Sequence, residues 1–467
     1  MAKVTSYGAA SMVTGSCHLL EVRSVKILID CGMLQGELWK SNYESFGFDP
    51  SSIDYLILTH AHNDHIGRVP KLIKEGFKGQ IISTDATFDI AYIMLLDSAA
   101  LLVEEYETQL RKAERRGEES SVQEPLYTKE HVEQVFSKKW HKVKYEECVT
   151  LAPFLKICLH NAGHIMGSAF AEIHYEDDNG TVKNVVFSGD LGSKNRLLIN
   201  PLTPIAEVNQ LFIESTYGDR EHRALNESLA EFKEAIKTTL DDGGNVIIPS
   251  FALERTQEIL WLLHGMHKEG LLHNCHVFLD SPLAIEATKI YQKYPTQLNK
   301  ALGLQVSLGD DPFNFPQLHH TPKKKDSIEI NEVKKRAIII AGSGMCTGGR
   351  VLHHLKQRIW NPKNAVIFVG YQVKGTLGRD IIDGEQFVRI YGEEIKVRAK
   401  IYTINGLSAH ADRADMLAWI KGMKNLSHIF LIHGEGDKLE LFKAYLKENV
   451  ESKVHIVKKN EAIYLND

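Results

Sequence analysis

The chain has 467 residues, 43% hydrophobic and 25% charged, which is the composition of a folded globular protein of about two domains. Its net charge of −5 excludes a globally basic surface, so any contact with nucleic acid has to come from a local groove. The start of the chain lacks the apolar core of a signal peptide, and no apolar run reaches the ~18 residues of a membrane span.

The cysteines show no spacing typical of a metal or disulfide framework. No C-x-x-C pair occurs, and the six residues are scattered: Cys17, Cys31, Cys148, Cys158, Cys275 and Cys346. This pattern predicts reduced thiols, with neither a disulfide scaffold nor a structural zinc knuckle. We therefore expect a cytoplasmic protein that does not contact a membrane.

The first part of the chain is predicted to be rich in strands. Hydrophobic patterning predicts strands at 3–9, 17–22, 25–30, 55–62, 154–160, 170–176 and 184–190, and helices at 64–75 and 86–116. Polar side chains such as Asp30 and Asp190 repeatedly stand where these strands end.

The pattern changes from about Ala224. Helices predicted over 224–240 and 253–266 alternate with short apolar strands, which begin at Asn245, His276, Ala337 and Ala365. Such alternation predicts a mainly parallel sheet covered by helices. After Lys400 the polar strand ends return, so the simplest organisation is one domain interrupted by another.

The segment LTHAHNDHIG, residues 58–67, carries four coordinating groups within six positions: His60, His62, Asp64 and His65. Alternate residues of a strand share a face, so His60 and His62 point together, while Asp64 and His65 lie where a helix begins. Imidazole and carboxylate groups are ligands for zinc. A lone histidine is ordinarily a core residue, but this cluster predicts a metal site.

Other strand ends are expected to complete the site. His164, with His160 as the alternative, Asp190 and His433 each follow an apolar strand. We assign His60, His62 and His164 to one metal ion. Asp64, His65 and His433 go to a second, and Asp190 lies between the two. Two ions ~3.5–4 Å apart would activate a shared water and hold the oxygens of a displacement at phosphorus.

The order of these motifs resembles a known family. Asp30, HAHNDH (60–65), AGH with His164 and SGD with Asp190 resemble the first four motifs of the metallo-β-lactamase fold. The segments FIEST with Glu214, SAHAD with His410 and LIHGE with His433 resemble the three further motifs of the β-CASP group. PSFALERTQE, DSPLA, GSGMCTGGR and GYQVKGTLGR are similar to its inserted domain. The resemblance spans essentially the whole chain. Within the group, the chain most resembles the bacterial and archaeal relatives of the cleavage and polyadenylation specificity factor endonuclease.

The resemblance implies an α/β fold. A metallo-β-lactamase αββα sandwich, residues 1–216 and 405–467, would be interrupted by a β-CASP domain, residues 217–404, with a mainly parallel sheet flanked by helices. It also implies two zinc ions held by the ligands assigned above. Asp64 would then serve catalysis as well as binding, and Asp30 would orient a ligand histidine through a hydrogen bond. Glu214 and His410 would form a catalytic pair, with His410 placed to meet the scissile phosphate or the leaving oxygen.

The glycine-rich segment AGSGMCTGGR, residues 341–350, matches neither a P-loop nor a dinucleotide fingerprint. Its glycines could form an ordinary turn or aim backbone N–H groups at a phosphate. In a β-CASP protein, Ser343 and Gly344 would line a cleft that faces the zinc ions. Arg255 and Lys374 are the candidate contacts to a nucleic-acid backbone.

The resemblance implies a zinc-dependent endonuclease that hydrolyses phosphodiester bonds of single-stranded RNA in RNA processing or decay. The alternatives are a 5′–3′ exoribonuclease and a DNA-directed β-CASP nuclease, although the DNA-directed branch typically carries valine at the position of His433. If the protein were a small-molecule hydrolase, the inserted domain and the SAHAD motif would have no role. A non-catalytic scaffold is disfavoured because every catalytic motif is intact. We expect neither the amino-terminal KH modules of archaeal relatives nor the long carboxy-terminal domain of ribonuclease J, and both absences argue against dimerisation and against a 5′-end-dependent exonuclease activity. The oligomeric state is left open by the sequence, with a homodimer as one alternative.

Overall fold

The computed structural model describes residues 2–118 and 122–465, and the chain divides into two compact units. Unit 1 comprises Met1–Lys194, Pro201–Glu221 and His410–Asp467. Unit 2 comprises His222–Ala409 together with the short segment Asn195–Asn200, which the sequence alone does not assign to it.

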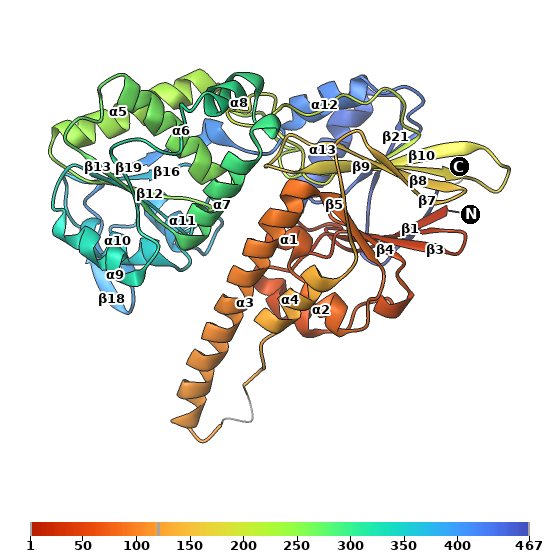
Figure 1. Cartoon of the computed structure of the whole chain (residues 1–467), viewed down its shortest axis with the longest axis horizontal. Coiled ribbons are helices and arrows are strands. Elements are labelled where there is room, and N and C mark those ends of the chain that lie inside the picture. The colour runs from red at the N-terminus through yellow and green to blue at the C-terminus, as the bar shows by residue number, and fades with distance from the viewer. Residues whose placement is uncertain (1, 119–121, 466–467) are drawn as a thin grey trace. The chain divides into compact units, whose positions relative to one another are not determined.

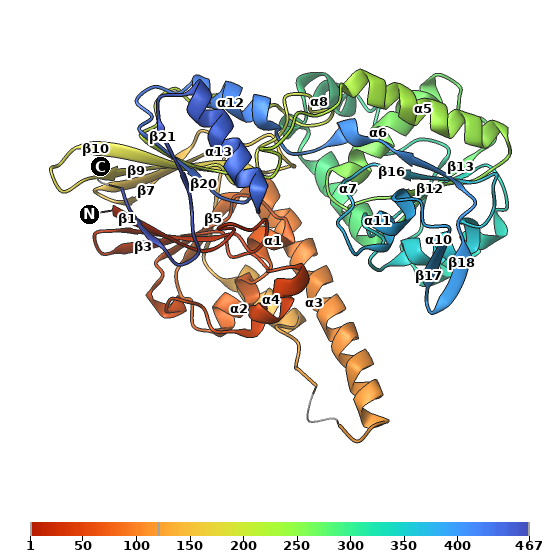
Figure 2. The ribbon, with the colours of Figure 1, turned by 180° about the vertical axis from the view of Figure 1, so that it is seen from behind.

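Unit 1 contains two seven-stranded sheets among its described residues. The first has the order β22-β1-β2-β3-β4-β5-β6, with β1 (Ala2–Gly8), β2 (Cys17–Val22), β3 (Val25–Ile29), β4 (Tyr55–Ile57), β5 (Gln80–Thr84), β6 (Trp140–Val143) and β22 (Ala462–Tyr464). The second has the order β21-β20-β11-β10-β9-β8-β7, with β7 (Cys148–Ala152), β8 (Leu155–Asn161), β9 (Ala169–Glu176), β10 (Val182–Phe187), β11 (Gln210–Ile213), β20 (His428–Leu431) and β21 (Lys453–Ile456). Strand β22 pairs with β1, so the two ends of the described chain lie side by side (Figures 1 and 2).

The two sheets share one hydrophobic core. Successive side chains of a strand point to opposite faces, so Ile157 of β8 and Ile173 of β9 enter this core while their neighbours face the other way. The rings of Phe187, Phe212 and Phe430 continue it across β10, β11 and β20, with centroid separations of 4.7 and 4.6 Å. This shared core holds the strand ends of both sheets in fixed positions.

Helices cover the outer faces of the sandwich. On the second sheet, α12 (Arg413–Lys421) and α13 (Asp437–Asn449) contribute Met416, Trp419 and Phe442 to a second core (Figure 2). On the first sheet lie α2 (Val69–Lys74), α3 (Asp85–Glu114) and α4 (Lys129–Ser137), beside the short α1 (Asn63–Ile66) (Figure 1). The predicted αββα sandwich is confirmed.

Two predicted elements are shorter than the hydrophobic pattern indicated. Strand β4 ends at Ile57, and residues 58–62 carry no regular secondary structure, although the N–H of Leu58 still bonds to the carbonyl of Ile82 in β5. The single helix predicted over 64–75 is broken into α1 and α2. Pro70 explains the break, because it cannot donate to the carbonyl four residues earlier and its ring would collide with that carbonyl.

Helix α3 corrects the expectation that no segment is apolar enough to cross a membrane. By length and composition alone it passes that test, although the core helix of a soluble protein passes it too. Its buried residues include Ile90, Leu95 and Leu102, which face the body of unit 1.

The cysteine prediction was wrong for one pair. Cys148 and Cys158 form a disulfide, with Cα atoms 4.2 Å apart. The reason is the β7–β8 hairpin register, which places the two residues directly opposite each other. The other four cysteines are free and buried. Cysteine usage therefore no longer argues for a reducing compartment.

Unit 2 is built on a six-stranded sheet, counted over the described residues, in which every pairing is parallel. Its order is β14-β13-β15-β12-β16-β19, with β12 (Val246–Pro249), β13 (His276–Asp280), β14 (Leu318–His320), β15 (Ala337–Ala341), β16 (Ala365–Phe368) and β19 (Lys400–Thr403). All residues of β12, β15 and β16 are buried, as expected for parallel strands covered on both faces. The predicted parallel sheet is confirmed.

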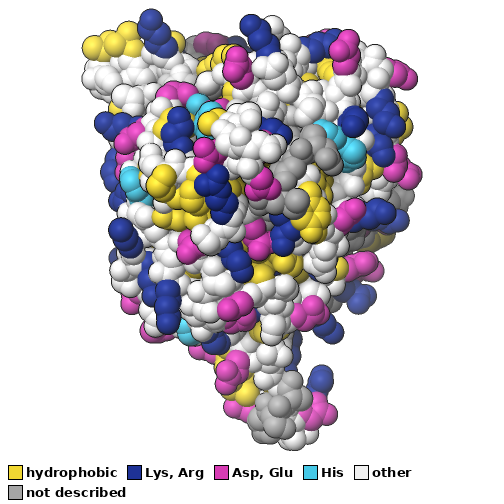
Figure 3. Space-filling view, turned by 90° about the vertical axis from the view of Figure 1, so that its right-hand side faces the viewer, with side chains coloured by type: hydrophobic (Ala, Val, Ile, Leu, Met, Phe, Trp, Pro, Cys, Tyr) yellow, Lys and Arg dark blue, Asp and Glu magenta, His cyan; other side chains and the backbone are white. Residues whose placement is uncertain are grey.

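The helices of unit 2 lie on the two faces of this sheet (Figure 1). They are α5 (Leu225–Asp241), α6 (Arg255–Lys268), α7 (Pro282–Lys293), α8 (Lys300–Ser307), α9 (Lys324–Glu329), α10 (Arg350–Arg358) and α11 (Leu377–Ile382). A small hairpin of β17 (Phe387–Ile390) and β18 (Glu393–Lys396) packs beside α11. Figure 3 looks onto the right-hand side of Figure 1, where elements of unit 1 are drawn. Basic and acidic side chains are interspersed on that face, so it carries no field of a single sign.

Candidate metal centre

Strand ends of unit 1 bring together the residues that the sequence singled out. His60 and His62 lie in the segment after β4, and α1 supplies Asp64 and His65. The other three follow β8, β10 and β20: they are His164, Asp190 and His433. All seven belong to unit 1.

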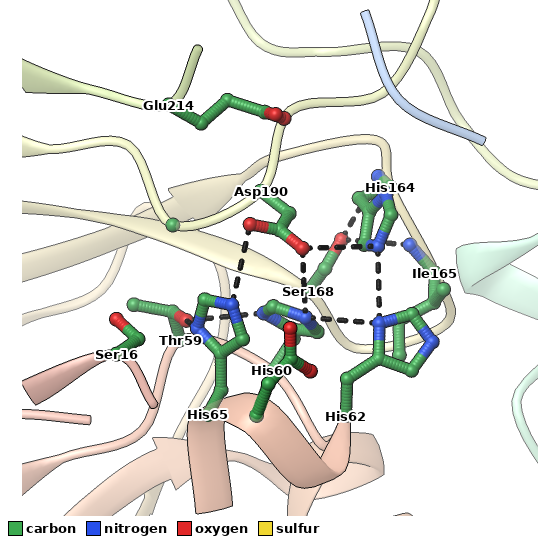
Figure 4. Close-up of polar contacts among 12 residues, drawn as sticks. Ser16, Thr59, His60, His62, His65, His164, Ile165, Ser168, Asp190 and Glu214 are labelled. Atoms are coloured by element: carbon green, nitrogen blue, oxygen red, sulfur yellow. Dashed lines mark hydrogen bonds and ion pairs between the residues drawn. The ribbon is translucent and has the colours of Figure 1, made fainter. Parts of the chain in front are cut away.

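One oxygen of Asp190 faces the first group of histidines (Figure 4). Its Oδ2 atom lies 3.4 Å from Nε2 of His60 and 3.6 Å from Nε2 of His164. Nδ1 of His62 lies 3.1 Å from Nε2 of His60 and 3.2 Å from Nε2 of His164. These four side chains each offer a ligand atom within 4.8 Å of the others.

The other oxygen of Asp190 faces the second group. Its Oδ1 atom lies 3.3 Å from Nε2 of His65 and 3.8 Å from Nδ1 of His433. Nε2 of His433 is 3.5 Å from Oδ2 of Asp64. Because its two oxygens are directed at different groups, Asp190 has the geometry of a bridging carboxylate.

The chemistry of the buried atoms fits a metal. Nε2 of His65, Oδ1 of Asp190 and Nε2 of His433 are buried and make no hydrogen bond, which is costly unless something else binds them. Burial lowers the pKa of His62 to about 3, and burial together with the neighbouring His410 lowers the pKa of His164. Neutral imidazoles of this kind present the lone pairs that a metal ion requires.

Asp30 and Thr59 hold a candidate ligand histidine in position through hydrogen bonds. Oδ2 of Asp30 accepts a hydrogen bond from Nδ1 of His65 at 2.7 Å, so the Nε2 atom of that ring faces the site. The backbone N–H and the hydroxyl of Thr59 both donate to Asp30 at 2.9 Å. Sequence reasoning found Asp30 but missed Thr59, because an ordinary threonine in an apolar run carries no signal of its own.

Ser168 holds the loop that carries His164. Its Oγ atom accepts hydrogen bonds from the backbone N–H of His164 at 3.0 Å and of Ile165 at 3.2 Å (Figure 4). Nothing in the sequence alone identified this residue. The alternative ligand His160 is not at the centre: its ring nitrogens contact Glu146 and Glu172.

Glu214 and His410 form a contact beside the ligands. Nδ1 of His410 lies 3.1 Å from Oε2 of Glu214 and 4.0 Å from Oδ2 of Asp190. Glu214 is fully buried, and its Oε1 accepts the backbone N–H of Leu191 at 2.6 Å. Burial opposes a charge on His410, but the carboxylates of Glu214, Asp190 and Asp64 outweigh it and raise its pKa to about 9. The acidic side chains around His410 therefore favour the protonated form of its ring.

The four predicted substrate contacts all belong to unit 2. Arg255 opens α6, is 6% exposed and is paired with Glu258, which it would have to leave to reach a phosphate. Ser343 and Gly344 lie in the turn after β15, where the side chain of Ser343 accepts the N–H of Thr347 at 2.9 Å. Lys374 is exposed. The roles of these residues stay predictions.

Three family profiles match the chain. Residues 12–135 match the metallo-beta-lactamase superfamily, residues 256–381 the Beta-Casp domain, and residues 394–457 a family described as a Zn-dependent metallo-hydrolase RNA specificity domain.

Similar proteins extend over nearly the whole chain. A protein named ribonuclease TTHA0252 from Thermus thermophilus is 37% identical over 441 residues, which cover 94% of each chain. The transcription termination factor FttA of Methanosarcina mazei is 32% identical, over 93% of this chain and 67% of that relative. A crystal structure of a protein of unknown function from Enterococcus faecalis V583 covers 99% of both chains with a TM-score of 0.55. At 12% identity, that last likeness shows the fold alone.

Proposed function

The chain belongs to the β-CASP family of metallo-β-lactamase-fold hydrolases, and we propose that it cleaves single-stranded RNA internally with the help of two zinc ions. The observation that carries the proposal is the placement of Asp190. Its two carboxylate oxygens face two separate groups of ligand atoms, as a pair of ions sharing one bridging ligand requires. Bound there, the ions would activate water and neutralise charge that develops on phosphate oxygens.

Residues around the metal centre would orient a ligand and supply a proton. Asp30 and Thr59 keep the ring of His65 oriented, so the position of the attacked phosphorus is set before substrate arrives. His410 carries a proton at neutral pH because Glu214 holds it there. We assign this proton to the oxygen that leaves phosphorus, since a departing alkoxide is a poor leaving group until it is protonated.

RNA is the proposed substrate because of the relatives. One is named a ribonuclease and is similar over almost its entire length, and one matching profile is described as an RNA specificity domain. In unit 2, exposed Lys374 is the proposed backbone contact. With a net charge of −5, binding should depend on few phosphate contacts and weaken only moderately with salt.

A circular single-stranded RNA tests the proposal. A circle has no end, so an endonuclease opens it, whereas an enzyme that starts from the 5′ end leaves it intact. We expect opening that stops when a chelator removes the metal and returns when zinc is added. A DNA circle of the same sequence should survive longer.

The controls decide between the alternatives. An intact RNA circle beside a degraded linear RNA would make the protein an exonuclease. Faster opening of the DNA circle would make it a DNA-directed nuclease. An Asp190→Ala protein that still opened the circle would show that the activity comes from a contaminant or from another site.

A further inference from the structure

A second cluster of metal-binding side chains lies on the helix-covered face of the second sheet of unit 1. The register of the β7–β8 hairpin places Cys148 opposite Cys158, and the β8–β9 register places Cys158 opposite Glu172. His160 and His174 follow on the same face, two residues further along β8 and β9 respectively. Two cysteine sulfurs, two imidazoles and a carboxylate therefore lie on neighbouring strands, outside the seven residues assigned to the metal centre.

The donor atoms of this cluster are close enough to share one ion. Cys158, His160 and Glu172 each offer an atom within 4.8 Å of the others. Nε2 of His160 lies 2.9 Å from Oε2 of Glu172, and Nε2 of His174 lies 3.0 Å from Oε1 of the same carboxylate. Donors around a tetrahedral zinc are separated by roughly 3.3–3.8 Å, so small side-chain movements suffice.

The neighbours of the cluster are arranged as in known metal sites. Nδ1 of His160 contacts the carboxylate of Glu146, which directs Nε2 of that ring toward Glu172 and Cys158. Nδ2 of Asn184 donates to Oε1 of Glu172 at 2.8 Å. Carboxylate-bound imidazoles and hydrogen-bonded carboxylates of this kind fix the ligands of zinc proteins and raise their basicity.

One ligand is unavailable in this structure, because the sulfur of Cys158 is bonded to Cys148. We propose that reduction of this disulfide creates a zinc site formed by Cys158, His160 and Glu172, so that metal binding there reports the thiol redox state. The fourth position would go to His174 or to water. The inference does not depend on the reaction proposed above, since it concerns other residues and another ion.

The chemistry balances with a dithiol as reductant. Cys148 is exposed and Cys158 is 2% exposed, so the attacking thiolate reaches the sulfur of Cys148 and expels Cys158 as a thiolate. The second thiol of the reductant then releases Cys148, and the reductant leaves as its own disulfide. Zinc binding next releases any proton on the Cys158 sulfur and the proton on Nε2 of His160 to solvent.

Cobalt absorption separates this site from the other. A thiolate bound to Co²⁺ gives a near-ultraviolet charge-transfer band, and the metal centre described above contains no cysteine among its candidate ligands. The protein is reduced with a phosphine, the phosphine is removed without air, and Co²⁺ is added to reduced and untreated samples. We expect one additional equivalent of Co²⁺ per chain in the reduced sample, together with the band.

Single-residue variants assign the band. Cys148→Ser leaves Cys158 as a free thiol, so the band should appear without reductant. Cys158→Ser and His160→Gln should lose both the band and the additional equivalent. Cys275→Ser, which removes a buried free cysteine in unit 2, is the matched control and should behave like the wild type.

Two results would overturn the proposal. The first is reduced wild-type protein in which thiol counting finds all six cysteines free but which takes up no additional Co²⁺ and shows no band. This comparison needs no variant, so a substitution that fails to fold does not obstruct it. The second is a band that persists in folded Cys158→Ser protein, which would assign the thiolate to another cysteine.

Discussion

The charge of Glu214 is predicted to hold the proton that His410 donates. Nδ1 of His410 lies 3.1 Å from Oε2 of Glu214, and the carboxylate of Glu214, with those of Asp190 and Asp64, raises the pKa of the ring to about 9. Replacing Glu214 with Gln keeps an oxygen that can accept the Nδ1 hydrogen bond but removes the negative charge. Burial, which favours the neutral ring, then dominates.

The expected effect depends on pH in a fixed direction. A group with a pKa of about 9 is roughly 90% protonated at about pH 8, whereas one at the ordinary value of 6.5 or below is at most roughly 3% protonated there. Turnover of Glu214→Gln should therefore fall about 30-fold or more relative to wild type at about pH 8. At lower pH the ring of the variant also gains the proton, so the deficit should shrink progressively as the pH falls towards the pKa of His410 in the variant. Bound cations would lower the pKa of His410 in both proteins and move this pH range downwards, so the change of the rate ratio with pH carries the prediction.

The assay is single-turnover cleavage of a labelled single-stranded RNA over this pH range, with the metal content of both proteins measured beforehand. Glu214→Ala, which also removes the hydrogen-bond acceptor, should be slower than Glu214→Gln at low pH. A deficit of equal size at every pH would refute the reasoning. It would mean that Glu214 acts on His410 through position alone and that its charge does not hold the proton.

Four further substitutions test the centre and the fold. Asp190→Ala should loosen both metal ions, because it removes the carboxylate that faces both groups; unchanged metal content by elemental analysis would contradict this. His410→Ala should keep the metal and lose ~10²–10⁴ in turnover, and loss of metal would mean that His410 is itself a ligand. Asp30→Asn should weaken metal affinity by about 10–100-fold in a chelator competition, since it disturbs the orientation of a ligand ring; unchanged affinity would exclude that role. Phe212→Ala, at a fully buried ring stacked between two others, should cost about 3–5 kcal/mol of unfolding free energy in denaturant titration, and a cost below about 1 kcal/mol would show that the core collapses around it.

Local patterning predicted much of the site. The spacing of His60 and His62 predicted that their side chains point together, and their ring nitrogens lie 3.1 Å apart; Asp64 and His65 follow within α1. Apolar runs such as 337–341 predicted the buried parallel strands of unit 2. These conclusions were accessible because the direction of a side chain within one element follows from the period of that element.

Pairings between distant segments became visible only in the tertiary structure. The two oxygens of Asp190 face different groups because the ends of four strands, β4, β8, β10 and β20, are fixed by one shared core. Thr59 and Ser168 acquire their roles only once those loops meet. The Cys148–Cys158 bond depends on the register of a hairpin.

The difference between local patterning and tertiary packing also explains which sequence-based predictions the structure corrects. The apolar pattern of the predicted helix continues past Pro70, but the missing N–H and the ring of this proline break the helix. The backbone requirement of proline therefore outweighed the hydrophobic period. Arg255 was predicted to contact a nucleic-acid backbone; that role stays a prediction, but the sequence did not indicate that the packing of unit 2 buries this side chain against Glu258. Sequence alone determined which side chains share a face within each strand or helix, because that depends on backbone period. The packing of whole sheets decided which faces meet, in which register the strands pair and how far each side chain is buried. Register and burial are properties of contacts between segments and not of any one segment.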